Sequence, residues 1–88
     1  MIWKIEFDPR AEKELKKLDR IAQKHIISYL KEQVAVQNNP RIFGKNLKGD
    51  KQGLWRYRVG DYRVICQILD ENLIILAIKV GHRKSVYD

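Results

Sequence analysis

The chain has 88 residues, 44% of them hydrophobic, so it can build one modest core and is not expected to be disordered. Its formal net charge of +7 is high for this length and favours an anionic partner, such as nucleic acid, an anionic surface or an acidic protein. We expect residues 1–88 to form a single domain.

Several classes of protein are disfavoured by what the sequence contains. The longest apolar run, 73–78, is too short to span a bilayer, and charged residues interrupt the N-terminal segment where a secretion signal would be apolar. A single cysteine, Cys66, cannot form an internal disulfide, and two distant histidines add no usual zinc site. We therefore expect a cytoplasmic protein without a metal or cofactor, in which Cys66 is a buried apolar side chain.

The N-terminal half predicts one strand and two helices. Apolar and charged residues alternate over 2–7, as in a half-buried strand. Asp8 followed by Pro9 is a typical helix start, and Asp19 can cap a second helix over 20–37. The apolar stripe of that second helix consists of Ala22, Ile26, Tyr29, Leu30 and Val34.

The C-terminal half predicts a loop followed by three strands. Residues 41–53 are rich in glycine and basic side chains and indicate a loop. Strands are expected over 54–59 and 62–69, joined by a Gly-Asp hairpin turn, and again over 72–80. The order β-α-α-β-β-β predicts an α+β fold, with a mainly antiparallel four-stranded sheet and both helices packed on one face.

Three arginines on the predicted strands point to a polyanion as partner. Because alternate strand residues share a face, Arg56 and Arg58 should point away from Trp55 and Tyr57, which then belong to the core. We expect Arg56, Arg58 and Arg63 to emerge on the sheet face that the helices leave open. The alternative is a solvated cationic face, or one that binds by charge alone without catalysis.

Basic side chains are sufficient for one kind of RNA chemistry. When a 2′-hydroxyl attacks the neighbouring phosphodiester, a base takes its proton, cations stabilise the phosphorane and an acid protonates the leaving 5′-oxygen. Guanidinium groups match phosphate geometry, histidine titrates near neutral pH, and tyrosine can stack on a base. His82 and Tyr87 are therefore candidates, although His82 could be an ordinary loop residue and Tyr87 could cover the core edge.

Four segments, spread over nearly the whole length of the chain, form a recognisable set. They read FDPRAEKELKKL, NLKGD, WRYRVGDYRVICQI and VGHRKSVY. The set resembles the RelE/ParE superfamily of toxins from toxin–antitoxin pairs, and its ending resembles the RelE branch. That resemblance implies a ribosome-dependent endoribonuclease that cuts mRNA in the A site, is neutralised by a RelB-like antitoxin and meets DNA only through the antitoxin complex. The alternative is a ParE-like, non-enzymatic inhibitor of DNA gyrase.

The resemblance also implies roles for individual residues. Arg56 and Arg58 stand where well-known relatives have lysines, one of which is assigned as the general base. Arginine stays protonated in proteins, so we take His82, beside Arg83, as the candidate base. Arg83 matches the arginine proposed to help the leaving group.

Further roles follow from the same resemblance. Arg63 matches a phosphate-stabilising arginine, and Tyr87 matches a tyrosine that stacks on the substrate base. Lys48 matches a basic loop residue that contacts RNA, and we assign Lys45 and Lys51 in the same loop to RNA binding with it.

Overall fold

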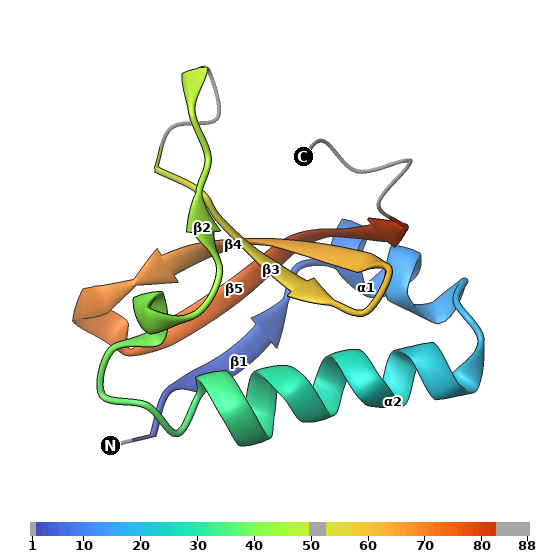
Figure 1. The fold of residues 1–88 in the computed structure, drawn as a ribbon, viewed down its shortest axis with the longest axis horizontal. Helices are drawn as coiled ribbons and strands as arrows, with labels where there is room; N and C mark the ends of the chain where they lie inside the picture. The colour runs from blue at the N-terminus through green and yellow to red at the C-terminus, as the bar shows by residue number, and fades with distance from the viewer. Residues whose placement is uncertain (1, 50–52, 83–88) are drawn as a thin grey trace.

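The computed structural model describes residues 2–49 and 53–82 and shows a twisted sheet with helices packed against one face (Figure 1). The elements in chain order are β1 (Lys4–Phe7), α1 (Pro9–Lys16), α2 (Arg20–Ser28), the π-helical turn η1 (Tyr29–Val34), the 3-10 turn η2 (Pro40–Ile42), β2 (Lys45–Asn46), β3 (Trp55–Val59), β4 (Tyr62–Leu69), the 3-10 turn η4 (Asp70–Asn72) and β5 (Ile74–His82).

The sheet has five strands in the order β1-β5-β4-β3-β2. Strand β1 runs parallel to β5 and the other neighbours are antiparallel, so the predicted α+β fold is confirmed. The predicted count of four strands was wrong, because two residues of the expected loop form β2. A strand this short has no periodicity to detect.

Gly44 permits the close approach of β2 to β3. Its backbone has a φ of +76°, and a Cβ at this position would lie 2.3 Å from the carbonyl oxygen of Arg56. Only glycine avoids both the left-handed strain and this overlap. The chain can therefore turn tightly into β2 and place Lys45 opposite Arg56.

Both predicted helix starts are confirmed. The carboxylates of Asp8 and Asp19 accept 2.8 Å hydrogen bonds from backbone N–H groups three residues further on, which satisfies donors that an uncapped helix would leave open. The prediction for the second helix was wrong about its end. The chain changes to π-helical geometry at Tyr29 and stops at Val34, and the Ala35 N–H donates to the Leu30 carbonyl five residues back.

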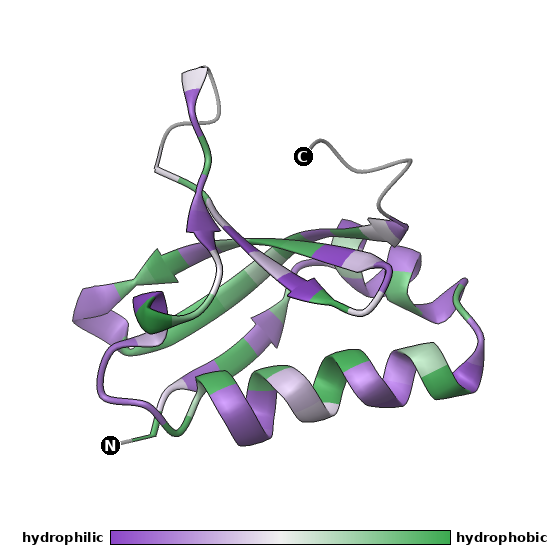
Figure 2. Cartoon of the chain, in the orientation of Figure 1, coloured by the Kyte–Doolittle hydropathy of each residue, from purple (hydrophilic) through white to green (hydrophobic). Residues whose placement is uncertain are grey.

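The main core lies between the sheet and both helices, and strands β4 and β5 supply much of its apolar surface (Figure 2). Cys66 is fully buried there, as predicted, and burial raises the pKa of its thiol. Tyr57 is also buried, and its hydroxyl donates a 2.8 Å hydrogen bond to the Pro40 carbonyl. The core therefore also anchors the segment that leads into β2.

Strand β5 ends at His82, two residues beyond the predicted boundary at 80. Its last residues continue past the stretch that pairs with β1. On this uncovered stretch the Val80 N–H donates to Glu14 Oε1 of α1 at 2.8 Å. Glu14 is in turn 3.5 Å from the Arg10 guanidinium. A carboxylate from α1 thus accepts a hydrogen bond from a backbone N–H group that lies beyond the last residue of β1.

Among residues 2–49 and 53–82, no helix is long and apolar enough to cross a membrane.

Candidate nucleic-acid interface

Four basic side chains from three strands occupy neighbouring positions on one face of the sheet. Arg58 pairs directly with Arg63 across β3 and β4, and Lys45 pairs with Arg56 across β2 and β3. Their strand neighbours Tyr57 and Val64 point into the core on the opposite face. We call Lys45, Arg56, Arg58 and Arg63 the cationic face.

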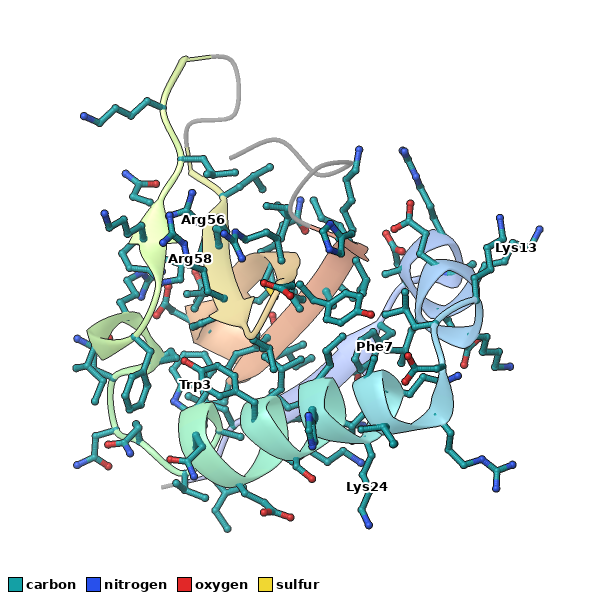
Figure 3. All side chains as sticks on the ribbon, turned by 45° about the vertical axis from the view of Figure 1, so that its right-hand side comes forward. Trp3, Phe7, Lys13, Lys24, Arg56 and Arg58 are labelled. Atoms are coloured by element: carbon teal, nitrogen blue, oxygen red, sulfur yellow. The ribbon has the colours of Figure 1, made fainter. Side chains whose placement is uncertain are left out.

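Figure 3 shows Arg56 and Arg58 close together beside β2 and β3, away from α2, whereas Trp3 and Phe7 lie nearer the helices. The pairing of β3 with β4 and the side-chain alternation thus agree with the sequence prediction about which way the arginines point.

The prediction that all three arginines emerge was wrong for two of them. Arg58 is exposed, but Arg56 is only 5% exposed and Arg63 only 6%. Arg63 Nη1 folds back along the hairpin and donates to the Tyr62 carbonyl at 3.2 Å. The two guanidinium groups are consequently held in place by packing, and the exposed Arg58 and Lys45 supply the accessible charge.

The open face carries its own small apolar cluster, which explains why arginines can be buried there. Leu47 and Ile65 are buried, and Leu54 and Ile78 pack against them. Leu47 belongs to an arm, residues 45–49 and 53–54, that rises from the sheet (Figure 1). The Leu47 N–H donates to the Leu54 carbonyl at 3.0 Å, so the two sides of the arm are tied. Arg56 lies between this arm and β4.

A fifth basic residue on the open face was missed by the sequence analysis. Lys79 pairs with Ile65, so it shares the face of Arg63, and it is half-buried. A register shift between Ile65 and Cys66 interrupts the alternation on β5, so Ile78 and Lys79 both lie on the open side. A period-2 reading of the sequence cannot locate such a bulge.

A cavity of about 200 Å³ opens at the β2–β3 end of the cationic face. Its lining consists of Tyr29, Gly44, Lys45, Arg56 and Arg58. Three of these residues are cationic, so the cavity suits an anionic group.

The loop beside this cavity is fixed by two contacts. Trp55 Nε1 donates a 2.6 Å hydrogen bond to the Phe43 carbonyl. Arg41 forms a two-pronged pair with the Asp70 carboxylate, at 2.9 and 2.8 Å, which raises the pKa of Arg41 and lowers that of Asp70. The position of Gly44 and Lys45 is therefore determined by neighbours on both sides.

His82 does not join the cationic face. It pairs with Tyr62, and the two rings meet edge to face with centroids 5.8 Å apart. Arg63 pairs instead with Gly81. Adjacent strand residues point to opposite faces, so His82 lies on the side of the sheet that the helices cover. Its place next to position 83 in the sequence gave no indication of this.

The remaining predicted site residues divide into two groups. Lys48 is exposed on the arm. Lys51, Arg83 and Tyr87 lie outside the described residues. Within the part of the chain that the structure describes, no three His, Cys, Asp or Glu side chains gather where they could hold a metal ion.

Tyr29 is the lining residue that the sequence analysis placed only in the core stripe. It is half-buried, and its ring meets those of Phe43 and Tyr57 edge to face. Burial raises the pKa of its phenol. The sequence did contain one indication that Tyr29 reaches the surface, because the hydroxyl of a tyrosine in an apolar stripe needs a polar environment.

Comparison with known proteins identifies the family. A family model described as the ParE toxin of type II toxin–antitoxin systems, parDE, matches residues 5–87. The chain is 33% identical over 86 residues to the mRNA interferase toxin RelE of Escherichia coli (strain K12), covering 96% of this chain and 86% of that protein. It therefore belongs to the ParE toxin family. Within the RelE/ParE superfamily it is RelE-like.

Solved structures agree with this placement. The toxin–antitoxin complex RelBE2 from Mycobacterium tuberculosis contains a chain with a TM-score of 0.86 at 24% identity, covering 94% of this chain and 93% of that one, and it shows the shared fold. The RelB–RelE antitoxin–toxin complex from Methanococcus jannaschii gives a TM-score of 0.70 at 28% identity, with 94% and 95% covered.

Proposed function

We propose that this toxin is a ribosome-dependent endoribonuclease that cleaves mRNA in the A site and so inhibits translation. The observation that carries the proposal is the cationic face, where paired strands bring together two packed arginines, one exposed arginine and a lysine. The name mRNA interferase, borne by the 33% identical relative, supports the same activity.

The chemistry assigned to the cationic face is stabilisation of a phosphorane. A base takes the 2′-hydroxyl proton as the 2′-oxygen attacks phosphorus and forms the new P–O bond. The bond to the 5′-oxygen breaks, this oxygen takes a proton from an acid, and negative charge grows on the non-bridging oxygens during the step. Fixed guanidinium groups stabilise that charge without having to reorganise, which favours the packed Arg63 for this role. The ribosome would hold the mRNA in line for attack, a geometry that one small face cannot impose.

The proton acceptor requires a separate test, because His82 lies across the sheet from Arg58 and Arg63. His82→Ala should retain most cleavage if the imidazole stays beside Tyr62. A large loss of cleavage with an unchanged melting temperature would instead assign His82 to the reaction. Primer extension on ribosome-bound mRNA gives the rate for both proteins.

The proposed partner is an acidic, RelB-like antitoxin. Related toxins form RelB–RelE complexes in solved structures, and the charge of +7 favours an acidic segment that wraps the cationic face. DNA would be met only through that complex. Titrating the toxin with an acidic antitoxin peptide should then suppress cleavage in proportion to complex formed.

The direct experiment adds the purified, antitoxin-free toxin to a defined translation reaction and maps new mRNA 5′ ends by primer extension. Cuts at A-site codons that require ribosomes are the expected result. Equal cutting of free mRNA would contradict the ribosome-dependent reading, and intact mRNA would contradict the nuclease itself.

A second candidate function comes from the matching family model, which is described as the ParE toxin. A ParE-like, non-enzymatic toxin would inhibit DNA gyrase and leave mRNA intact. A DNA supercoiling assay with the same preparation distinguishes the two, since only the gyrase inhibitor should lower supercoiling.

A further inference from the structure

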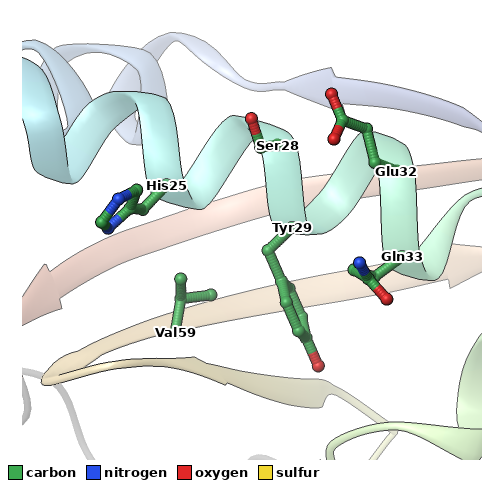
Figure 4. A pocket seen from close by; sticks show the side chains of 6 residues that line it. All are labelled: His25, Ser28, Tyr29, Glu32, Gln33 and Val59. Atoms are coloured by element: carbon green, nitrogen blue, oxygen red, sulfur yellow. The ribbon is translucent and has the colours of Figure 1, made fainter.

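Tyr29 begins the π-helical turn and is a lining residue of two cavities. Figure 4 shows its ring projecting from the helix toward the strands, while Ser28 and Glu32 lie on the other side of the helix. One cavity, of about 290 Å³, is lined by His25, Ser28, Tyr29, Glu32, Gln33 and Val59. The other is the 200 Å³ cavity of the cationic face.

Charge distinguishes the two cavities. The cavity along the helix has the acidic residue Glu32 in its lining, and none of the described residues that line it is a lysine or an arginine. The described residues that line the cavity at the β2–β3 end include Lys45, Arg56 and Arg58 and no acidic side chain. An anionic group therefore fits the second cavity and not the first.

We propose that the cavity lined by Tyr29, Gly44, Lys45, Arg56 and Arg58 is a nucleotide-phosphate subsite. It would hold a phosphate of the RNA strand neighbouring the one that is cleaved, and the Tyr29 hydroxyl would donate a hydrogen bond to it. This inference rests on the proposed function, because it supplies a second anchor for the same RNA.

The placement of the cationic groups supports two anchors. Arg56 and Arg58 are two residues apart on β3, which is roughly 6.6 Å along a strand. Arg58 pairs with Arg63 in one row across the sheet, and Arg56 pairs with Lys45 in the next. One row can hold the phosphate that reacts while the other row holds its neighbour.

The Tyr29 ring is held in the orientation that this role needs. Its edge-to-face contacts with Phe43 and Tyr57 have centroid distances of 6.2 and 6.3 Å. Burial raises the pKa of the phenol, so the hydroxyl keeps its proton at neutral pH and can donate to a phosphate oxygen. A π-helical turn is rare and frequently occurs at functional sites, which agrees with a binding role at its first residue.

Gly44 also lines the cavity, and its position does not tolerate a side chain. A side chain there would be forced against the Arg56 carbonyl and the Trp55 indole nitrogen, at 2.3 and 2.8 Å from the added Cβ. Without a Cβ, the backbone can turn beside the cavity and bring Lys45 into register with Arg56 on the neighbouring strand.

The test measures binding without cleavage. Adenosine 5′-monophosphate is titrated into the toxin, with inorganic phosphate in a parallel arm, and the amide NMR signals of residues 29, 44 and 45 are followed. Tyr29→Phe keeps the ring contacts and removes only the hydroxyl, so binding of the nucleotide should weaken roughly tenfold. Lys45→Gln should weaken binding and flatten its dependence on salt.

Tyr62→Phe is the matched control, because Tyr62 is half-buried like Tyr29, contacts His82 and is not one of the residues that line this cavity. It should bind like the unaltered protein. Equal binding by Tyr29→Phe and the control, or nucleotide shifts centred on residues 25, 28 and 32, would overturn the subsite. Binding of inorganic phosphate with no gain from the nucleoside would limit the site to a bare anion and also contradict the proposal.

The subsite and the proposed nuclease activity can be tested separately. Ribosome-dependent cleavage that is unaffected by Tyr29→Phe and Lys45→Gln would remove the subsite and leave the nuclease standing. Nucleotide binding that depends on both side chains, in a protein that never cuts mRNA, would retain the subsite and remove the nuclease.

Discussion

The two faces of the sheet bury different chemistry to similar depths. On the helix-covered face, Tyr57 and Val64 are fully buried among apolar neighbours. On the open face, Arg56 and Arg63 are 5% and 6% exposed although they carry charge. Burial of apolar groups stabilises a fold, whereas burial of guanidinium groups costs solvation free energy that other interactions must offset. The first face therefore contributes most of the apolar burial, and we propose that the second face contributes to function.

The largest effect expected from this comparison is a cavity in the main core. Leu30→Ala removes a fully buried side chain and should lower the free energy of unfolding by about 3–5 kcal/mol. Ile65→Ala, in the small cluster of the open face, should cost about 2 kcal/mol because its partly exposed neighbours can relax. Urea denaturation measures both, and equal losses would break the distinction between the faces.

A smaller effect is expected from the hydrogen bond between Glu14 of α1 and the Val80 N–H near the end of β5. Glu14→Ala leaves the Val80 N–H without its acceptor and should cost about 1–3 kcal/mol. Glu14→Gln retains an acceptor oxygen and should cost much less. Thermal melts of the two variants provide the measurement, and indistinguishable melting temperatures would show that this hydrogen bond is not important.

The Tyr57 hydroxyl tests how the core fixes the loop before β2. Tyr57→Phe removes the donor to the Pro40 carbonyl and should cost about 1 kcal/mol. Burial raises the pKa of Tyr57 in the folded protein. The protonated hydroxyl therefore contributes fully to the free energy of unfolding below the unfolded-state pKa of about 10, and this contribution is lost as pH rises through the folded-state pKa. Between pH 8 and 11 the free energy of unfolding of the unaltered protein should fall by an amount that Tyr57→Phe does not show.

The smallest effect belongs to the exposed Arg41–Asp70 pair. Arg41 lowers the pKa of Asp70 in the folded protein. The ion pair therefore contributes to the free energy of unfolding above about pH 4, and this contribution is lost as pH falls through the folded-state pKa of Asp70. Because the Asp70 side chain is 59% exposed, solvent screening limits the contribution to about 0.2–1 kcal/mol. Asp70→Asn should abolish this acid-dependent part, which urea denaturation at pH 3 and pH 7 can detect.

Much of the fold could be predicted from local signals. The Asp8 and Asp19 caps and the Gly60 turn each depend on a few adjacent residues. Strand β4 was predicted with its observed bounds, because its alternation and flanking turn residues are clear. Such features are encoded within a short window of sequence and need no knowledge of distant partners.

The errors arise where distant segments decide the outcome. The two residues of β2 form a strand only because Gly44 lets them approach β3. The bulge that places Lys79 on the open face exists only in the pairing of β4 with β5. The depth of Arg56 depends on the arm that rises beside it. Alternation predicts a direction for a side chain, but its exposure depends on what else packs there.

We propose that the cationic face cuts ribosome-bound mRNA, and a substitution of Arg58 is the sharpest probe of this activity because the side chain is exposed and can be changed without disturbing the core. Primer extension on mRNA in translating ribosomes would compare the unaltered toxin with Arg58→Ala and with Arg20→Ala, an exposed arginine at the start of α2. We expect Arg58→Ala to lower the cleavage rate by about 10²-fold at an unchanged melting temperature, and Arg20→Ala to cut normally. Equal cleavage by all three proteins would contradict the account.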